Sequence, residues 1–500
     1  MYSPGSKESK AFATMNKSIN LCSIFRSRKH LFTYTAFFLL LTGCANPGFE
    51  ERRDDSQHLR SALEAETRAI LDEAGGRLSL SNVVGLVRER SLKTVERELE
   101  ATLARVNRAT AFSAFLPNVE ASYGRGVFSN LRGDYGPYSF DAGRTFGDSA
   151  SITLTQPVFT PVAWIMFAES QYGVRINDLL EDRAREMLDA ATAALYHETV
   201  IADRLRRTYA LQLASDAELT NRLSALVREG FALESDAVRA KARLALSAVS
   251  LHAAEDAAAT ARAKLCETMR LWPLASFGVD GDSLAAVTEF PWTLKGEDGA
   301  AETVAGSAVR KMPLEEIVWQ ALVNRKELYA ADQMVELRKA QVMEALAGFL
   351  PNVMGEAGGQ RMTLEHLNAR YWNGALMGTW AAFEGFRSVQ NYRAARARRE
   401  AEFKLHEDRM LAVVTSTVET WRNWKRAEED FAAAREASEA AELVCRDVEK
   451  LFEEGEETMS CLLDRRAERD AAQVRAEKAR YAVALAEIAL RQAMGVGIGF

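Results

Sequence analysis

The pentapeptide FLPNV occurs twice in this chain, at residues 115–119 and again at residues 349–353. Each copy follows a long charged, alanine-rich stretch and precedes a short glycine-rich one. Proline disfavours a helical conformation in the residue before it, so a helix is expected to end at each leucine-proline step. The residues that follow alternate between apolar and polar, which is typical of a strand. Pro117 and Pro351 are therefore predicted to lie at two helix-to-strand joints.

A helix of the same length is predicted before each joint. Leu80 lies 36 residues before Leu116, and Leu314 lies 36 residues before Leu350. Because the helix, the joint and the strand all recur, the chain is predicted to contain two tandem units.

Two strands joined by a glycine-rich loop are predicted after each joint. In the first unit Val119, Ala121 and Tyr123 alternate with polar residues. The strands are expected to be about ten residues long, a length that suits a bilayer. The stretch NLRGDYGPYSFDAGRTFGD, residues 130–148, is expected to be loop. Pro157 and Pro161 are predicted to mark the return joint of the first unit.

Two long helical hairpins are predicted from the distribution of proline and glycine. No proline lies between Pro161 and Pro273 or after Pro351; the only glycine from Val174 to Phe277 is Gly230, and the only one from Phe386 to Met494 is Gly455. Proline costs a helix interior about 3 kcal/mol and glycine about 1 kcal/mol, whereas glycine readily adopts the left-handed conformation of a turn. Each hairpin is expected to turn at its glycine, with arms of roughly 100 Å at 1.5 Å per residue.

Heptad-like spacing supports the hairpins. Small and apolar residues from Ala472 to Ala493 recur at alternating intervals of four and three, as in a coiled-coil seam. The predicted fold is mainly α with a small β part, built from long antiparallel coiled-coil helical hairpins and four membrane strands per chain. The expected boundaries are 78–273 for the first repeat, 274–311 for a linker, 312–495 for the second repeat and 496–500 for a short tail.

Residues 1–43 are predicted to be a signal peptide. A basic region precedes the apolar stretch LFTYTAFFLLL, which is too short to span a bilayer. The sequence then reaches LTGC, which resembles a bacterial lipobox, in which the cysteine (here Cys44) is lipidated and begins the mature chain. The alternative is an ordinary signal peptide that happens to contain a cysteine, and the start codon is either Met1 or Met15. Residues 44–77 are expected to form a lipid-anchored N-terminal segment.

Composition excludes several function classes. The chain has 48% hydrophobic and 27% charged residues and a net charge of −7, which favour a globular or coiled-coil protein without a nucleic-acid-binding surface. Cys266, Cys445 and Cys461 have neither the even count of a disulfide framework nor the paired spacing of a zinc site. They are predicted to be unpaired, and neither a metal nor a cofactor is expected.

The four strands are predicted to share a barrel with strands of other copies. They have one apolar face, they are too few to close a barrel, and an open strand edge is not tolerated in lipid. If they face lipid, several chains must contribute to one barrel, and the helices then project away from the membrane.

The chain resembles the TolC-like outer-membrane efflux family from about Leu78 to Gly495. The resemblance rests on the tandem halves, the two leucine-proline-asparagine joints, the segment QPVF at residues 156–159 and the closing segment LLDRRAERDAAQVRAEKARYAVALAEIALRQAMG. It implies a homotrimer in the outer membrane, with a shared twelve-stranded barrel and a periplasmic tube of helices. It also implies a tripartite pump that exports small molecules with a periplasmic adaptor and an inner-membrane transporter, and a channel that catalyses no reaction.

The resemblance also implies a gate at the periplasmic end. In the family, acids six and nine residues after the second-turn glycine narrow the tube; here the ninth residue is Asp464, and the sixth is Cys461. Asp236, six residues after the first-turn glycine, also fits. The alternative is that both aspartates are solvated helix charges.

The two turns are predicted to contact the adaptor. Many pump-associated members have valine-glycine-leucine at the tip, whereas this chain has Glu-Gly-Phe at residues 229–231 and Glu-Gly-Glu at residues 454–456. The acidic second turn fits either a basic adaptor surface or a merely solvated turn. The expected contact residues are Gly230, Phe231, Gly455 and Glu456.

Two other functions fit the helices: the exit channel of a type I protein secretion system, and a lipid-anchored periplasmic coiled-coil scaffold without a pore. The lipid anchor favours efflux over secretion, and the strand pairs argue against the scaffold. An enzyme is not expected, because the histidines are scattered and no HExxH, GxxxxGK(S/T) or GxSxG motif is present. Trp372 and Trp380, near strand ends, fit membrane-interface anchors or a core or loop role.

Overall fold

The structure, a computed structural model, describes residues 48–135, 138–280, 292–295, 301–304, 306–364 and 367–497. Contacts divide the chain into two units, residues 1–63 and 64–500. The predicted signal peptide and Cys44 lie outside the described residues. Helix α2 (Phe49–Glu73) begins in the first unit and ends in the second. No described helix is long and apolar enough to cross a membrane.

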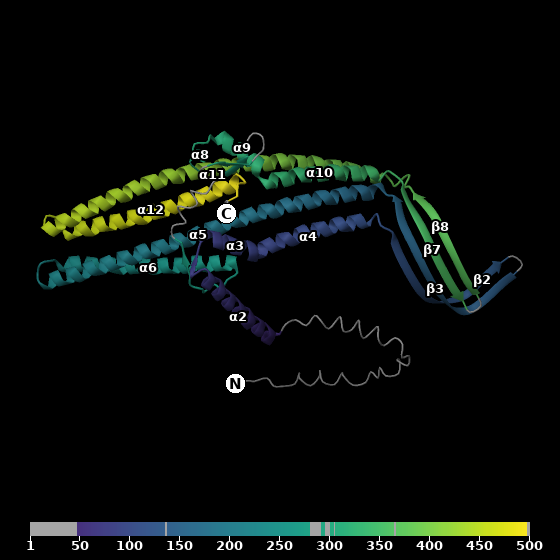
Figure 1. Ribbon diagram of the computed structural model, residues 1–500, viewed down its shortest axis with the longest axis horizontal. Helices are drawn as coiled ribbons and strands as arrows, with labels where there is room; N and C mark the ends of the chain where they lie inside the picture. Colours follow the sequence, from purple (N-terminus) through teal and green to yellow (C-terminus); the bar gives the residue numbers. More distant parts are fainter. Residues whose placement is uncertain are drawn as a thin grey trace, which may run out of the picture. The chain divides into compact units, whose positions relative to one another are not determined.

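The two repeats of the second unit have the same order of elements: a broken helix, two strands, a 68-residue helix and a shorter returning helix (Figure 1). The first repeat consists of α3 (Leu80–Arg90), α4 (Leu92–Ser113), β2 (Asn118–Tyr135), β3 (Tyr138–Phe159), α5 (Pro161–Arg228) and α6 (Glu234–Met269). The second consists of α9 (Leu314–Asn324), α10 (Lys326–Ala347), β7 (Asn352–Leu364), β8 (Leu367–Thr379), α11 (Arg387–Glu454) and α12 (Met459–Ala493). The predicted mainly helical fold with long hairpins and four strands is confirmed.

The long helices α5 and α11 each have 68 residues, or about 100 Å at 1.5 Å per residue. Helix α5 begins at Pro161, a position where the missing N–H of proline has no helical partner to lose. Helix α11 begins after Gly385 and Phe386, which have φ values of 60° and 65°. Each long helix packs along its returning helix, and α5 also contacts α4, α10 and α12. The hairpins of the two repeats therefore pack against each other through α5 and α12.

The predicted single helix before each joint is wrong, because it is broken at one residue in both repeats. Ser91 separates α3 from α4 and Arg325 separates α9 from α10, with φ/ψ values of −67°/127° and −66°/115°. Neither residue is a proline or a glycine, although Ser91 is of a type favoured at the N-cap of a helix. At Arg325 the cause is tertiary: the buried guanidinium donates from Nε to the Ala493 carbonyl oxygen at 2.6 Å and from Nη1 to Glu327 at 2.8 Å. The cation thus lies at the C-terminal end of α12, where the helix dipole favours it.

The prolines of FLPNV lie in the connections that follow, Pro117 between α4 and β2 and Pro351 between α10 and β7. The strands after Pro117 are longer than predicted: β2 and β3 have 18 and 22 residues and pair with each other up to Tyr135 and Tyr138. Residues 130–135 and 138–148 are therefore strand rather than loop, because cross-strand pairing outweighs the weak strand propensity of glycine.

Pro157, predicted at the return joint, instead lies within β3. It sits where the pairing of β3 with β7 becomes irregular, between Pro157 and Phe159. Proline lacks the N–H that a regular ladder needs, so an irregular position tolerates it. The strand ends at Phe159, and the return joint is the step from Thr160 to Pro161.

The four strands form one antiparallel sheet in the order β2-β3-β7-β8. The β3–β7 pair joins the two repeats, and β2 and β8 are the edges of the sheet. Figure 1 shows the sheet at the end of the long helices that is opposite to the hairpin turns.

A hydrophobic core lies where the first repeat meets the predicted linker, and it includes Leu78, Tyr196 and Val279. The hydroxyl group of Tyr196, on α5, donates to the Leu78 carbonyl oxygen at 2.9 Å. In this core β1 (Arg77–Leu78) pairs in parallel with β4 (Gly278–Val279). The antiparallel pair of β5 (Trp292–Lys295) and β6 (Ala301–Val304) and the short helix α8 (Gly306–Val309) belong to a second core, with α9, α11 and α12.

Cys266, Cys445 and Cys461 are free thiols, as predicted. The first two are buried and the third is half-buried. Burial raises the pKa of the Cys266 thiol to about 11. Because the thiolate is the reactive form, Cys266 is a packing residue rather than a nucleophile.

Candidate functional site

Both hairpins turn at a glycine in the left-handed conformation. Gly230 and Gly455 each have a φ of +81°, in a region that other residues rarely adopt. The residues after them, Phe231 and Glu456, donate their backbone N–H at 2.9 Å to the carbonyl oxygen five residues earlier. This bond satisfies one of the carbonyl groups that a helix end leaves without a partner.

The two turns present different chemistry. Phe231 and Leu233 of the first turn are 78% and 69% exposed. The second turn instead exposes Glu453, Glu454 and Glu456. Two of the predicted contact residues, Phe231 and Glu456, therefore belong to one apolar and one acidic surface.

The two predicted gate residues lie on different hairpins. Asp236 is half-buried in the first turn of α6, where the positive end of the helix dipole favours a carboxylate. Asp464, on α12, has a side chain that is 65% exposed, and its Oδ1 lies 3.5 Å from Nη2 of Arg239 on α6. Arg239 also donates to the Ser460 hydroxyl at 2.5 Å. An exposed pair of this kind is weak, about 0–1 kcal/mol, so it links Asp464 to the first hairpin only loosely.

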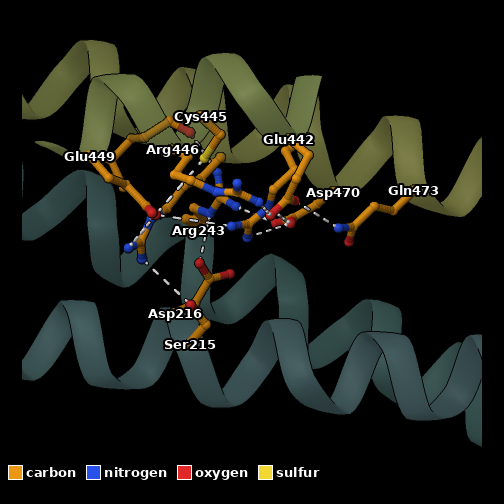
Figure 2. A network of polar contacts seen from close by, with 12 residues as sticks. Ser215, Asp216, Arg243, Glu442, Cys445, Arg446, Glu449, Asp470 and Gln473 are labelled. Atoms are coloured by element: carbon orange, nitrogen blue, oxygen red, sulfur yellow. Dashed lines mark hydrogen bonds and ion pairs between the residues drawn. The ribbon is translucent and has the colours of Figure 1, made fainter. Parts of the chain in front are cut away.

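A buried polar network between the hairpins was not predicted (Figure 2). At its centre Arg243 of α6 donates from Nε to Asp216 of α5 at 2.8 Å and from Nη2 to Asp470 of α12 at 2.6 Å. Its Nη1 donates to the Leu463 carbonyl oxygen at 2.7 Å. The Arg243 and Asp216 side chains are 18% and 4% exposed. One guanidinium group therefore holds three groups from both hairpins.

The network continues along α11 and α12, as Figure 2 shows. Arg466 donates to Glu449 at 2.8 Å and to the Ser215 hydroxyl at 3.5 Å, and Gln473 donates to Glu442 at 3.2 Å. Together with the contacts of Arg243, these contacts connect all four helices of the two hairpins.

A signal for this network was present in the sequence. Leu188, Leu195, Ala202 and Tyr209 form a heptad stripe on α5, and Asp216 occupies the next position of that stripe. A carboxylate that continues a buried stripe requires a buried cation as partner.

Two carboxyl groups of α5 have pKa values shifted in opposite directions. Burial and the nearby charge of Glu344, on α10, raise the pKa of Glu169 to about 7. Burial also raises the pKa of Asp203, but hydrogen bonding to Arg206 and the charges around it, including that of Arg262, outweigh burial and lower it overall. Glu169 therefore exchanges protons near neutral pH, whereas Asp203 stays charged.

In the rows nearest the helices the sheet has one largely apolar and one largely polar face, which follows from its register. Residues directly opposite each other on paired strands point to the same face, and successive residues alternate. The apolar face carries Val119, Ala121, Ile152, Leu154, Ala357, Trp372 and Leu376. The other face carries Asn118, Glu120, Ser122, Ser151, Thr153, Glu356, Gln360 and Asn373.

The described part of the chain contains no group of three His, Cys, Asp or Glu side chains placed to hold a metal ion. The features that stand out are instead the two turns, the network between the hairpins and the two-faced sheet.

The fold matches that of solved outer-membrane channels. The channel OprN has a TM-score of 0.68 and 17% identity over 84% of this chain and 91% of its own. CmeC of Campylobacter jejuni has a TM-score of 0.66 and 14% identity over 84% and 86% of the two chains. MtrE of Neisseria gonorrhoeae, solved in an open state, has a TM-score of 0.66 and 16% identity over 84% and 89%. These likenesses show the fold.

The sequence of the second repeat matches a known family. Residues 317–496 match the family described as outer membrane efflux protein. The second repeat is therefore similar in sequence to outer membrane efflux proteins. No curated protein matches it at a significant level. Outer membrane efflux proteins are channels and not enzymes, in agreement with the prediction that this chain catalyses no reaction.

Proposed function

We propose that this chain is the outer-membrane channel of a tripartite pump that exports small molecules, drugs and toxic compounds among them. The observation that carries the proposal is the sheet, with one apolar face and two open edges, at the end of two 68-residue helices. Such a chain supplies both a wall within the membrane and a conduit across the periplasm.

The open edges of the sheet support a homotrimer. Among the described residues, strands β2 and β8 each have one partner strand, and every unpaired backbone group costs several kcal/mol in lipid. Four strands are too few to close a barrel. Three copies joined from β8 of one protomer to β2 of the next supply 3 × 4 strands, the twelve-stranded barrel that the family resemblance implies.

The two faces of the sheet support its orientation. Strands of membrane barrels alternate between lipid-facing apolar and interior polar residues, so the apolar face is outward and the face with Glu120 and Gln360 lines the interior. Strands β7 and β8 have 13 residues each. At 3.4 Å per residue they extend about 44 Å, which at a tilt of about 40° covers the roughly 30 Å hydrocarbon core.

The helices then form the periplasmic tube, and its far end holds the gate. Around a threefold axis, three copies of Asp464 and of Asp236 bring like charges together, which repel one another and attract cations. The Arg239 guanidinium, 3.5 Å from Asp464, draws each carboxylate toward its own protomer. Opening of the tube requires α12 to move relative to α6 and so to break this weak pair.

The hairpin turns, at the end of the helices remote from the sheet, are the proposed contact surfaces for partner proteins. The apolar first turn and the acidic second turn are the surfaces for a periplasmic adaptor, which connects the tube to an inner-membrane transporter. Lipidation at Cys44 anchors the N-terminal segment to the outer membrane. The exit channel of a type I protein secretion system shares this geometry, and the lipid anchor favours efflux. Loss of drug export without loss of protein secretion, in cells that lack the chain, separates the two.

The decisive experiment is single-channel recording of the purified chain in planar bilayers. We expect discrete conductance steps, and a weaker preference for cations in Asp464→Ala. The control is Asp256→Ala, which removes the same charge from an exposed position on α6 and is expected to conduct as the native chain does. Protein that never inserts would contradict the channel and leave the lipid-anchored scaffold; equal selectivity in both variants would remove Asp464 from the gate.

A further inference from the structure

We propose that two arginines on the apolar face of the sheet, Arg361 and Arg370, bind the phosphate group of an anionic lipid in the outer leaflet. The inference rests on the proposed function, because it takes the apolar face to be the one in contact with lipid.

The register of the sheet places the two arginines side by side. Arg361 on β7 is directly opposite Arg370 on β8, which brings their Cβ atoms to about 4.5–5.5 Å and makes two like charges unfavourable neighbours. Both side chains are exposed, and neither forms an ion pair with any described residue. The carboxylate in the neighbouring row, Asp148, already contacts Arg125 at 3.4 Å and the Tyr123 hydroxyl at 3.2 Å. Within the described part of the chain, no carboxylate therefore pairs with Arg361 or Arg370.

A pocket on the sheet lies beside Arg361 and Arg370. It has a volume of about 300 Å³, and its walls include Ile152, Gly359, Trp372 and both arginines. The Trp372 ring lies across Gly359, where a Cβ would come within 2.8 Å of it, although the tryptophan is 82% exposed. Because Gly359 has no side chain, the Trp372 ring can lie across it and stay next to the two arginines.

The depth of the pair matches a lipid headgroup. Arg361 is eight residues beyond Val353, which is about 27 Å along the strand and roughly 20 Å across the membrane at the usual tilt of such strands. The apolar band of a membrane barrel is about 25 Å tall. The pair thus lies at the edge of the band that is remote from the helices, where an arginine costs about 0–1 kcal/mol rather than the 2–4 kcal/mol of the midplane.

The chemistry of the pocket selects a phosphate-bearing lipid. Guanidinium groups bind phosphate through paired hydrogen bonds, and two of them suit a group with several acceptor oxygens. The rows on the helix side of the pair carry Ile152, Leu154 and Trp372, which offer an acyl chain an apolar surface. A free phosphate ion would use the arginines but leave this surface unoccupied, so the occupant is the lipid.

The test is native mass spectrometry of the full-length trimer, purified in detergent with phosphatidylglycerol or with phosphatidylcholine. We expect retained phosphatidylglycerol to fall about fivefold for each arginine removed in Arg361→Gln, in Arg370→Gln and in the double variant. Replacement of both by lysine keeps the charges but loses the paired hydrogen bonds, so retention between that of the native chain and that of the double glutamine variant is expected. Arg435→Gln, about 70 Å along α11 from its start, removes an exposed arginine and is expected to match the native chain.

Equal retention in the native chain and the glutamine variants overturns the inference, as does displacement of the lipid by millimolar inorganic phosphate, which assigns the site to the free ion. If the double variant does not assemble, the single variants and the lysine variant decide. A native chain that neither forms trimers nor inserts into bilayers refutes the proposed function. A native chain that conducts but retains phosphatidylglycerol independently of the arginines refutes only this inference.

Discussion

Gly495 and Arg325 meet where the second repeat begins and ends. Gly495 has a φ of +67°, and a Cβ there would lie 2.9 Å from the backbone nitrogen of Arg325. The Arg325 guanidinium donates to the carbonyl oxygen of Ala493, at the end of α12. The break between α9 and α10 therefore packs against a backbone segment that leaves no space for a side chain.

Substitution of Gly495 by alanine is expected to destabilise the chain by at least about 2 kcal/mol, from the left-handed conformation and the overlap with Arg325. Gly497→Ala is the matched control, because a Cβ at Gly497 meets nothing within 4 Å and its φ is not in the left-handed region. Denaturant midpoints measured from helical circular dichroism compare the two. Equal midpoints would show that the contact between Gly495 and Arg325 carries no stability.

Single residues differ in how far the local sequence predicts their role. The turns at Gly230 and Gly455 are predictable, because each of these glycines is isolated in a long stretch that otherwise favours helix. Arg325 was not found as a helix break, because its conformation depends on Ala493, which is 168 positions away in sequence. Arg239 and Arg243 were missed for the same reason: an arginine on a charged helix has no local mark that distinguishes a buried bridge from a solvated side chain.

Among elements, the contact between the two hairpins depends on a charged group in an otherwise small and apolar seam. Arg243 lies on α6. Within the described network, it is the only side chain of that helix that contacts both α5 and α12. Asp216 is 4% exposed, and breaking a buried pair leaves an uncompensated charge that costs about 3–5 kcal/mol.

Arg243→Met is expected to loosen the two hairpins from each other. Asp216 and Asp470 lose their shared cation, so the opening free energy of the surrounding helices falls by about 3–5 kcal/mol. Hydrogen exchange of α6 and α12 measures this change. Arg465→Met is the control, since Arg465 is on α12 but its side chain is 42% exposed and pairs with Glu468 within the same helix. Identical exchange in the two variants would argue that the network does not hold the hairpins together.

The elements were predicted with uneven success, for physical reasons. Helices α5 and α11 follow from the absence of proline and glycine, since an unbroken helix satisfies its hydrogen bonds locally. The length of β2 and β3 does not, because their hydrogen bonds are made to each other and glycine-rich sequence gives weak strand signals. The two-faced sheet could be anticipated from alternation in β2, whereas the opposition of Arg361 and Arg370 needs the register between β7 and β8.

At the scale of the whole molecule, two independent features favour attachment to the membrane: the lipidation predicted at Cys44 and the sheet. The sequence before α2 suggested the first, and the apolar face with its open edges suggests the second. One multiply acylated cysteine anchors stably, so attachment alone does not distinguish a channel from a tethered scaffold.

A chain secreted with an ordinary cleavage site and Cys44→Ala is expected to stay in the outer-membrane fraction after an alkaline wash. Incorporation of radioactive palmitate is expected to disappear in this variant and to persist in the control Cys461→Ala, which alters a half-buried helix residue. Release of the Cys44 variant as free periplasmic protein would contradict membrane insertion of the sheet.

The equal length of α5 and α11 limits how such a chain can evolve. An insertion of one residue in either arm lengthens it by 1.5 Å and rotates everything beyond by about 100°, which takes the seam out of register. Seven residues restore the register of a coiled coil, but only if the returning helix gains seven as well. Unless the other repeat changes in step, the two turns then end at different distances from the sheet. Length variation among descendants is therefore expected in coordinated heptads across four helices, so that duplicated halves stay coupled in size long after their sequences have diverged.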